Sequence, residues 1–314
     1  MHQVLAGSTG STSSPETGRL AALIEDYLLD CQARGLSPKT MKDNYRWPLE
    51  RVLLPFTERA AISEPAQLDQ RALNRLSVEL LERGPSGKPL SRFSVNSYLN
   101  AINLFLAWAA REGEMPKVRA QPPRLPRRVV AVLSREELER LEDAAPAERD
   151  KLIVRVLADT GLRASELLGL RVRDLIQRDR QYLLHVSGKG SRERLVPVPP
   201  AVFRRLLRLV RGRSLDERVF LTLRRQAGGE YQPLSQAGLG QMLANLGELA
   251  GLEQPVHPHL LRHSFATWAL TRGMNPIQLA QILGHSSLRM IYSVYSHLSS
   301  GDAYEALMRV LAAD

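Results

Sequence analysis

The sequence predicts a mainly helical protein with one small β-hairpin or sheet, an α+β fold divided into two domains. Apolar residues recur at three- and four-residue steps through most of the 314 residues, which is the pattern of amphipathic helices. Alternation with a period of two is confined to residues 181–198. A proline-rich basic stretch at 114–132 separates two segments, 19–113 and 133–314, and each is long enough to bury a core.

The composition favours a polyanionic partner. The net charge is +10, and nucleic acid is the commonest partner of so basic a protein, although an arginine-rich proteome would also give a generally basic surface. No apolar run approaches the roughly 20 residues of a membrane span, so no membrane partner is expected. Cys31 is the only cysteine. It excludes an internal disulfide and favours the cytoplasm.

The first domain is predicted to hold four helices and no strand. Residues 1–18 are rich in Ser, Thr and Gly without an export signal, so we expect a flexible tail. A helix from Arg19 ends at Gly35, and Ser37 then caps a second helix that Pro48 should kink or break. A third apolar-periodic segment covers 66–83 and ends before a turn-rich GPSGKP, and a fourth begins near Ser91.

Residues 114–132 form the predicted linker. They carry four prolines, and they hold five basic residues against one acidic residue, so they should be extended and unable to fold alone. Such a stretch either wraps nucleic acid or is simply solvated.

The second domain, 133–314, opens with a helix whose Ser134 and Glu137 form a capping box. The next helix, containing KLIVRVLAD, ends at Gly161, so Arg163 stands at a helix junction with Glu166 three residues on. An arginine among apolar neighbours costs free energy unless it is paired or meets an anion. Both readings stay open here: a structural ion pair with Glu166, or a group that binds an anion.

A β-hairpin is predicted at 181–198, where QYLLHV and RLVPVP flank SGKGSRE. Lys189 would lie near its tip, either as a solvated turn lysine or as a mobile cation for a phosphate. Helical patterns return from 200 to 252. Asn275 and Pro276 then start a further helix that Gly284 ends, and His285 follows.

Several chemically active side chains gather between residues 257 and 297. His259 and Arg262 are three apart and would share a helix face, with His263 beside them. Further on come His285 and two tyrosines, Tyr292 and Tyr295. A guanidinium can neutralise a phosphate diester, imidazoles can move protons and a phenol can attack phosphorus. The pattern therefore predicts phosphoryl transfer, with no metal and no cofactor.

Taken in order, these motifs resemble the tyrosine recombinase (phage integrase) family. TGLRASELLGL resembles its first arginine motif, SGKGSRERLVPVP its lysine hairpin, HPHLLRHSFAT its His-x-x-Arg motif and LGHSSLRMIYSVYSHL its His-to-Tyr segment. The segments SPKTMKDNYRWPLE and SVNSYLNAINLFLAWA resemble the helical (SAM-like) core-binding domain of the family. The resemblance covers roughly 19–314. It implies a two-domain DNA clamp with a core-binding domain at 19–113 and a catalytic domain at 133–314.

The resemblance also implies roles for individual residues. The nucleophile would be Tyr295, and the scissile phosphate would be held by two arginines, Arg163 and Arg262. Lys189 would protonate the leaving 5′ oxygen. His259 would share the tyrosine proton and His285 would bind a non-bridging oxygen, with Glu166 and His263 in support. Spacing alone does not separate Tyr295 from Tyr292. The Tyr-Ser-His that begins at Tyr295 is what matches the ending of the family motif.

As partners, the resemblance implies a specific double-stranded DNA site and a homo- or hetero-tetramer assembled on it, in the cytoplasm and on the nucleoid. Candidate DNA contacts in the first domain and the linker are Lys39, Lys42, Arg46, Arg92, Asn96, Arg124, Arg127 and Arg128. Two other functions remain open: a type IB topoisomerase-like relaxing activity and a catalytically silent DNA-binding relative. The biological role is either Xer-like resolution of chromosome or plasmid dimers, or integration and excision of a transposon, phage or integron.

Overall fold

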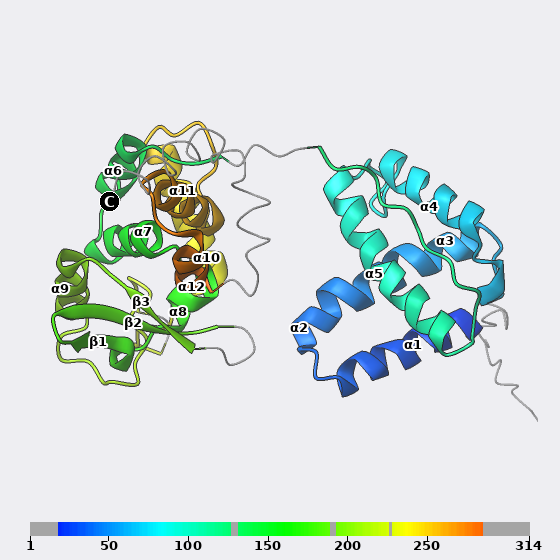
Figure 1. Cartoon of the computed structure of the whole chain (residues 1–314), viewed down its shortest axis with the longest axis horizontal. Coiled ribbons are helices and arrows are strands. Elements are labelled where there is room, and N and C mark those ends of the chain that lie inside the picture. Colours follow the sequence, from blue (N-terminus) through cyan, green and yellow to red (C-terminus); the bar gives the residue numbers. More distant parts are fainter. Residues whose placement is uncertain (1–17, 127–130, 189–192, 226–227, 285–314) are drawn as a thin grey trace, which may run out of the picture. The chain divides into compact units, whose positions relative to one another are not determined.

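A computed structural model describes residues 18–126, 131–188, 193–225 and 228–284. The chain forms two compact units, Met1–Arg128 and Val129–Asp314 (Figure 1). In the described residues the fold is mainly helical with one three-stranded sheet in the second unit, as the sequence predicts. Among these residues no helix has both the length and the apolar character needed to span a bilayer.

The first unit is built from helices around an aromatic centre. The helices are α1 (Gly18–Ala33), α2 (Pro38–Thr40), α3 (Leu54–Arg59), α4 (Gln70–Glu82) and α5 (Arg92–Arg111). Ser37, Asp69 and Ser91 each cap the helix that follows by accepting a backbone N–H bond. The ring of Tyr27 lies 5.6 Å from that of Phe105, measured between ring centroids, in the buried core.

The second helix does not break at Pro48. Two π-helical segments, Met41–Arg46 and Leu49–Leu53, lie on either side of it and continue the helical path to α3. The backbone N–H groups of Trp47 and Leu54 donate to oxygens five residues back, at Lys42 and Leu49. A proline supplies no N–H to the usual bond four residues back, and the wider turns accommodate this loss without ending the helix.

Part of the expected linker packs against the first unit. Residues 116–126 form neither helix nor strand, yet Met115 and Ala120 are buried in the core of that unit. The Asn103 side chain of α5 fixes the segment, since it donates to the Ala120 carbonyl at 2.9 Å and accepts from the Ala120 N–H at 2.8 Å. Residues 127–130 lie outside the described ranges.

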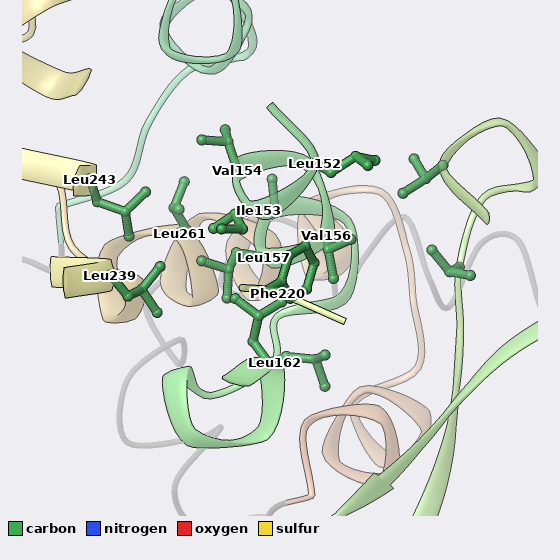
Figure 2. Close-up of a cluster of buried hydrophobic side chains, with 14 of the residues drawn as sticks. Leu152, Ile153, Val154, Val156, Leu157, Leu162, Phe220, Leu239, Leu243 and Leu261 are labelled. Atoms are coloured by element: carbon green, nitrogen blue, oxygen red, sulfur yellow. The ribbon is translucent and has the colours of Figure 1, made fainter. Parts of the chain in front are cut away.

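The second unit surrounds a buried helix, α7 (Glu148–Thr160). It packs against α6 (Arg135–Asp143), α9 (Pro200–Leu209) and α11 (Pro258–Thr271). Figure 2 shows the apolar cluster in which α7 contributes Leu152, Ile153, Val154, Val156 and Leu157, and α10 (Gln236–Leu249) contributes Leu239 and Leu243. Two short helices, α8 (Ala164–Gly169) and α12 (Pro276–Leu283), complete the elements that carry the site.

The sheet is antiparallel in the order β1 (Leu175–Arg178), β2 (Gln181–Ser187) and β3 (Glu193–Pro197). The hairpin of β2 and β3 pairs Leu184 with Val196, in the segments that the sequence predicts. Strand β1 was not expected. Its turn to β2 uses Asp179 and Arg180 at φ 44° and 68°. A two-residue turn with positive φ is normally marked by Asn-Gly or Asp-Gly, and here Arg180 stands where the glycine is usual.

Candidate functional site

Arg163 is positioned by a change of direction between two helices. Gly161 ends α7 with a left-handed backbone, φ 62°, and Arg163 is the N-cap residue of α8. A Cβ atom at position 161 would lie 2.5 Å from the ring of Phe265 on α11, so both the backbone angle and the packing require glycine there. The Arg163 side chain keeps 36% of its surface exposed.

Glu166 is the buried acid of the site, with 3% of its side chain exposed. Its carboxylate accepts from the Arg163 backbone N–H at 2.9 Å and from the Arg163 guanidinium at 2.8 Å. It also accepts a two-pronged pair of bonds from Arg194, both at 2.9 Å. Burial raises the pKa of Glu166, but the Arg194 bonds, followed by those of Arg163, outweigh it and hold that pKa below its ordinary value.

Arg194 was not singled out from the sequence. It lies on β3 with 14% of its side chain exposed, and its Nε donates to the carbonyl of Ile282 at 2.7 Å. A signal for it does exist in the chain. Because side chains alternate along a strand, Arg194 is in phase with buried Val196 and should point toward the core side.

Arg262 is buried on α11, with 6% of its surface exposed. It donates to the carbonyl of Gly161, the residue that ends α7, and to the carbonyl of Leu283 at 2.8 Å. The structure therefore brings Arg262 to the same place as Arg163, although they are 99 positions apart in the sequence (262 minus 163).

The C-terminal end of α12 is where the arginines meet. Arg163 donates to the carbonyls of Leu283 and Gly284, both at 3.2 Å, Arg262 donates to Leu283, and Arg194 donates to Ile282. Carbonyls at a helix C-terminus lack intrahelical partners and carry the negative end of the helix dipole, so cations are stabilised there. Three guanidiniums thus converge on one helix end, directly before His285 in the chain.

The histidines are placed only in part. His259 is exposed in the first turn of α11, and His263 is half-buried on the same helix. His257 caps α11, and its Nδ1 accepts the Leu260 N–H at 3.1 Å. The sequence-predicted Lys189, His285 and Tyr295, together with the alternative Tyr292, lie outside the described residues.

The candidate DNA contacts that the structure describes fall into two groups. The side chains of Lys39, Lys42, Arg92 and Arg124 are exposed. Two others have partners inside the protein: Arg46 pairs with the carboxylates of Glu25 and Glu50, and Asn96 accepts a bond from Asn100 at 2.8 Å. Arg127 and Arg128 lie outside the described ranges. Pairing with two carboxylates reduces the positive charge and the number of N–H donors that Arg46 has available for a phosphate.

The arrangement of the arginines suits an oxyanion. Among the described residues, no group of three or more His, Cys, Asp and Glu side chains could hold a metal. The bonds from Arg163 to described residues use three of the five N–H groups of its guanidinium. The Nε–H and one Nη2–H are left, and these two adjacent donors can bind two oxygens of a phosphate at once.

Comparison with known proteins also connects this chain with integrases and recombinases. The sequence profile of the "Phage integrase family" matches residues 131–301. The tyrosine recombinase XerC of Xanthomonas axonopodis pv. citri (strain 306) is 32% identical over 285 residues, which cover 88% of this chain and 87% of that protein. The tyrosine recombinase XerA of Thermococcus kodakarensis is 29% identical over 268 residues, covering 85% and 87%.

Solved structures show the same fold. The Tn1549 transposon integrase in complex with transposon right end DNA aligns with a TM-score of 0.71 at 20% identity, covering 94% of this chain and 99% of that chain. The XerH site-specific recombinase bound to palindromic difH substrate aligns with a TM-score of 0.66 at 20% identity, covering 93% and 84%.

Proposed function

Because this chain belongs to the phage integrase family of tyrosine recombinases, we infer that it is a site-specific DNA recombinase, which cleaves DNA and rejoins it in a new combination. The observation that carries the chemistry is the convergence of Arg163 and Arg262 on the end of α12. Two guanidiniums close together, one of them with two adjacent donors that no described residue occupies, can stabilise the charge that builds up on a phosphate under attack.

The proposed reaction is a transesterification. The Tyr295 oxygen attacks the phosphorus, the bond from phosphorus to the 5′ oxygen breaks, and a 3′-phosphotyrosine and a free 5′-hydroxyl result. His259 takes or shares the tyrosine proton, Lys189 delivers a proton to the 5′ oxygen, and His285 donates to a non-bridging oxygen. The covalent bond conserves the diester energy, so a 5′-hydroxyl from another DNA strand can reverse the step without a cofactor.

Strand exchange needs active sites on two paired DNA sites. We therefore propose a homo- or hetero-tetramer assembled on double-stranded DNA, acting in the cytoplasm on the nucleoid. The recombinases and transposon integrase reported above favour strand exchange over a topoisomerase-like relaxation in cis. Similarity to XerC and XerA over 85–88% of the chain favours an Xer-like role, resolution of chromosome or plasmid dimers, over integration of a mobile element.

A covalent trap tests the proposal. The protein is incubated in EDTA with nicked suicide DNAs that carry candidate crossover sites from the genome of its host, and the adduct is mapped by mass spectrometry. We expect a DNA adduct on Tyr295 that leaves a free 5′-hydroxyl. Tyr295→Phe should abolish the adduct and leave DNA binding nearly unchanged.

The matched control is Tyr292→Phe, which removes the other phenol of the same segment and should still form the adduct. Loss of the adduct in Tyr292→Phe but not in Tyr295→Phe would move the nucleophile to Tyr292. DNA binding without any adduct, on every candidate site, would favour the catalytically silent relative.

A further inference from the structure

Arg194 is a buried cation whose position is defined by three elements. From β3 it reaches the Glu166 carboxylate on α8 through two bonds of 2.9 Å and the Ile282 carbonyl on α12 through one of 2.7 Å. Gly284 packs directly against the Arg194 guanidinium, since a Cβ atom at position 284 would lie 2.8 Å from Arg194 Nη1. These contacts hold the Arg194 guanidinium in a single position. Through Glu166 that position is next to Arg163, the arginine proposed to bind the phosphate.

The second argument is the charge of the cluster formed by Arg163, Glu166 and Arg194. Glu166 is buried and contacts both Arg163 and Arg194, so one negative charge serves two positive charges. The net charge of the three groups is +1 (two guanidiniums, one carboxylate). Without Arg194 the carboxylate would face Arg163 alone, and the net charge would fall to zero. A neutral pair attracts a phosphate far less than a cation does.

The hydrogen bonds lead to the same conclusion. Glu166 orders Arg163 through its backbone N–H and one Nη1 bond. Its second oxygen is occupied by the Arg163 N–H and by Arg194 Nη2. If Arg194 were absent, this oxygen would be free to draw the Arg163 guanidinium into a two-pronged pair. Such a pair would draw the guanidinium away from the carbonyls of Leu283 and Gly284, and would turn the Nε–Nη2 edge out of the orientation in which it can meet the phosphate.

We propose that Arg194 is a positioning residue for DNA cleavage, which balances the Glu166 carboxylate and thereby keeps the charge and one donor edge of Arg163 available to the scissile phosphate. This inference rests on the proposed recombinase function. It assigns Arg194 no contact with DNA, so its effect is expected on the cleavage rate and not on DNA affinity.

A charge series tests it through the rate of adduct formation on saturating nicked suicide DNA. Arg194→Met gives the cluster a net charge of 0, whereas Arg194→Lys and the double variant Arg194→Met with Glu166→Gln both keep +1. We expect Arg194→Met to be about 100-fold slower than wild type, comparable with the loss of one oxyanion donor. The two variants of charge +1 should stay within about tenfold of wild type, and the DNA dissociation constant should change less than about threefold throughout.

A purely structural role predicts a different order. Rates would then follow the number of hydrogen bonds lost, and the double variant would be the slowest. That order, or a wild-type rate for Arg194→Met, would overturn the inference. Arg173→Met is the matched control, since Arg173 is an exposed arginine of the same unit paired with Asp216 at the surface. It should cleave normally.

The experiment distinguishes a folding defect, a failure of the proposed function and a failure of the Arg194 inference. Circular dichroism establishes that each variant is folded. If Arg194→Met does not fold, the two variants of charge +1 still test the inference, because it requires both of them to cleave within about tenfold of the wild-type rate. A wild-type protein that binds candidate sites and never forms an adduct would count against the proposed function. A normal wild-type rate with the order of a structural role would count against Arg194 alone.

Discussion

At the scale of single residues, the site depends on how one buried carboxylate is shared. Glu166 joins Arg163 to Arg194, so the structure contains the Arg163–Glu166 ion pair that is one of the two readings left open by the sequence. The ion pair with Glu166 exists, but it does not consume the guanidinium, because Arg194 supplies a second positive charge and Arg163 keeps 36% of its side chain exposed. A structural pair and an anion-binding group are therefore compatible at this position.

Glu166 makes the stability of the second unit depend on pH. Its pKa is lowered in the folded state, so its ion pairs stabilise the fold above the ordinary Glu value of about 4.3, and this stability is lost as the pH falls through the lower folded value. Glu166→Gln should reduce the free energy of unfolding by about 3 kcal/mol at pH 7, because it leaves the Arg194 charge buried without its partner. The difference from wild type should shrink below about pH 4.

Denaturant unfolding at pH 7, 5 and 3.5 measures this difference. Glu139→Gln is the control, because Glu139 is an exposed acid of α6 paired at 3.7 Å with Arg135, and surface pairs contribute little. A loss of stability in Glu166→Gln that is the same at all three pH values would contradict the role of the carboxylate charge.

Lys189 is tested by changing the leaving group. Lys189→Ala should slow cleavage by about 100- to 10,000-fold, the usual contribution of a general acid. A DNA whose 5′ leaving oxygen is replaced by sulfur should restore the rate, since a thiolate leaves without being protonated. Lys151→Ala, which changes a lysine of α7, should behave as wild type on both DNAs. If the sulfur-containing DNA gives no rescue, Lys189 is not the acid.

At the scale of elements, α12 is the part of the second unit on which the site arginines converge. Asn275 caps its start by accepting the Ile277 N–H at 2.8 Å, and Gly284 ends it with a left-handed backbone, φ 65°. The sequence predicts both ends. It does not show that the carbonyls of the last turn bind Arg163, Arg194 and Arg262. The position of this helix thus sets the position of the arginines.

Gly284→Ala should disturb this helix end in two ways. The left-handed backbone costs about 1–2 kcal/mol for alanine, and the added Cβ would press against the Arg194 guanidinium. We expect a lower melting temperature and slower cleavage. Gly212→Ala separates the two effects, since Gly212 has φ 78° and no atom within 4 Å of an added Cβ.

The Gly212 variant should lose a similar amount of stability from its backbone and cleave at the wild-type rate. Equal stability losses and equal cleavage rates in the two variants would mean that the contact between Gly284 and Arg194 has no consequence.

At the scale of the whole molecule, the excess positive charge predicts how DNA binding responds to salt. Each phosphate neutralised by a cation releases counterions and contributes about −0.9 to the slope of log K against log salt concentration. The protein should therefore bind DNA with a steep slope. A flat response would contradict extensive phosphate contacts.

Single arginines of the first unit refine this prediction. Arg92→Ala removes an exposed cation and should reduce the magnitude of the slope by about 1. Arg46→Ala should change it less, because Arg46 already pairs with Glu25 and Glu50. Fluorescence anisotropy at several salt concentrations measures both slopes. A larger effect for Arg46 than for Arg92 would mean that these ion pairs open when DNA binds.

The sequence by itself determined the elements and the residues of the motifs. Caps such as Ser37, Ser91 and Ser134, and the helix end at Gly161, are set by bonds within a few residues, so a short stretch of chain contains the whole signal. Strand β1 was missed, because its turn has Arg180 where a glycine usually marks the positive φ. At Pro48 the sequence leaves a kink and a break open, and the structure continues the helix through widened turns.

Only the tertiary structure decided which charges meet. Arg163 reaches Leu283, 120 positions away, and Arg194 reaches Glu166, 28 positions away, while Arg46 is neutralised by Glu25 across 21. Such pairings depend on how helices and strands pack, and the periodicity of a single element carries no record of them. The sequence therefore contains the arginines, and only the fold shows that Arg163 keeps 36% of its side chain exposed while Arg194 and Arg262 are largely buried.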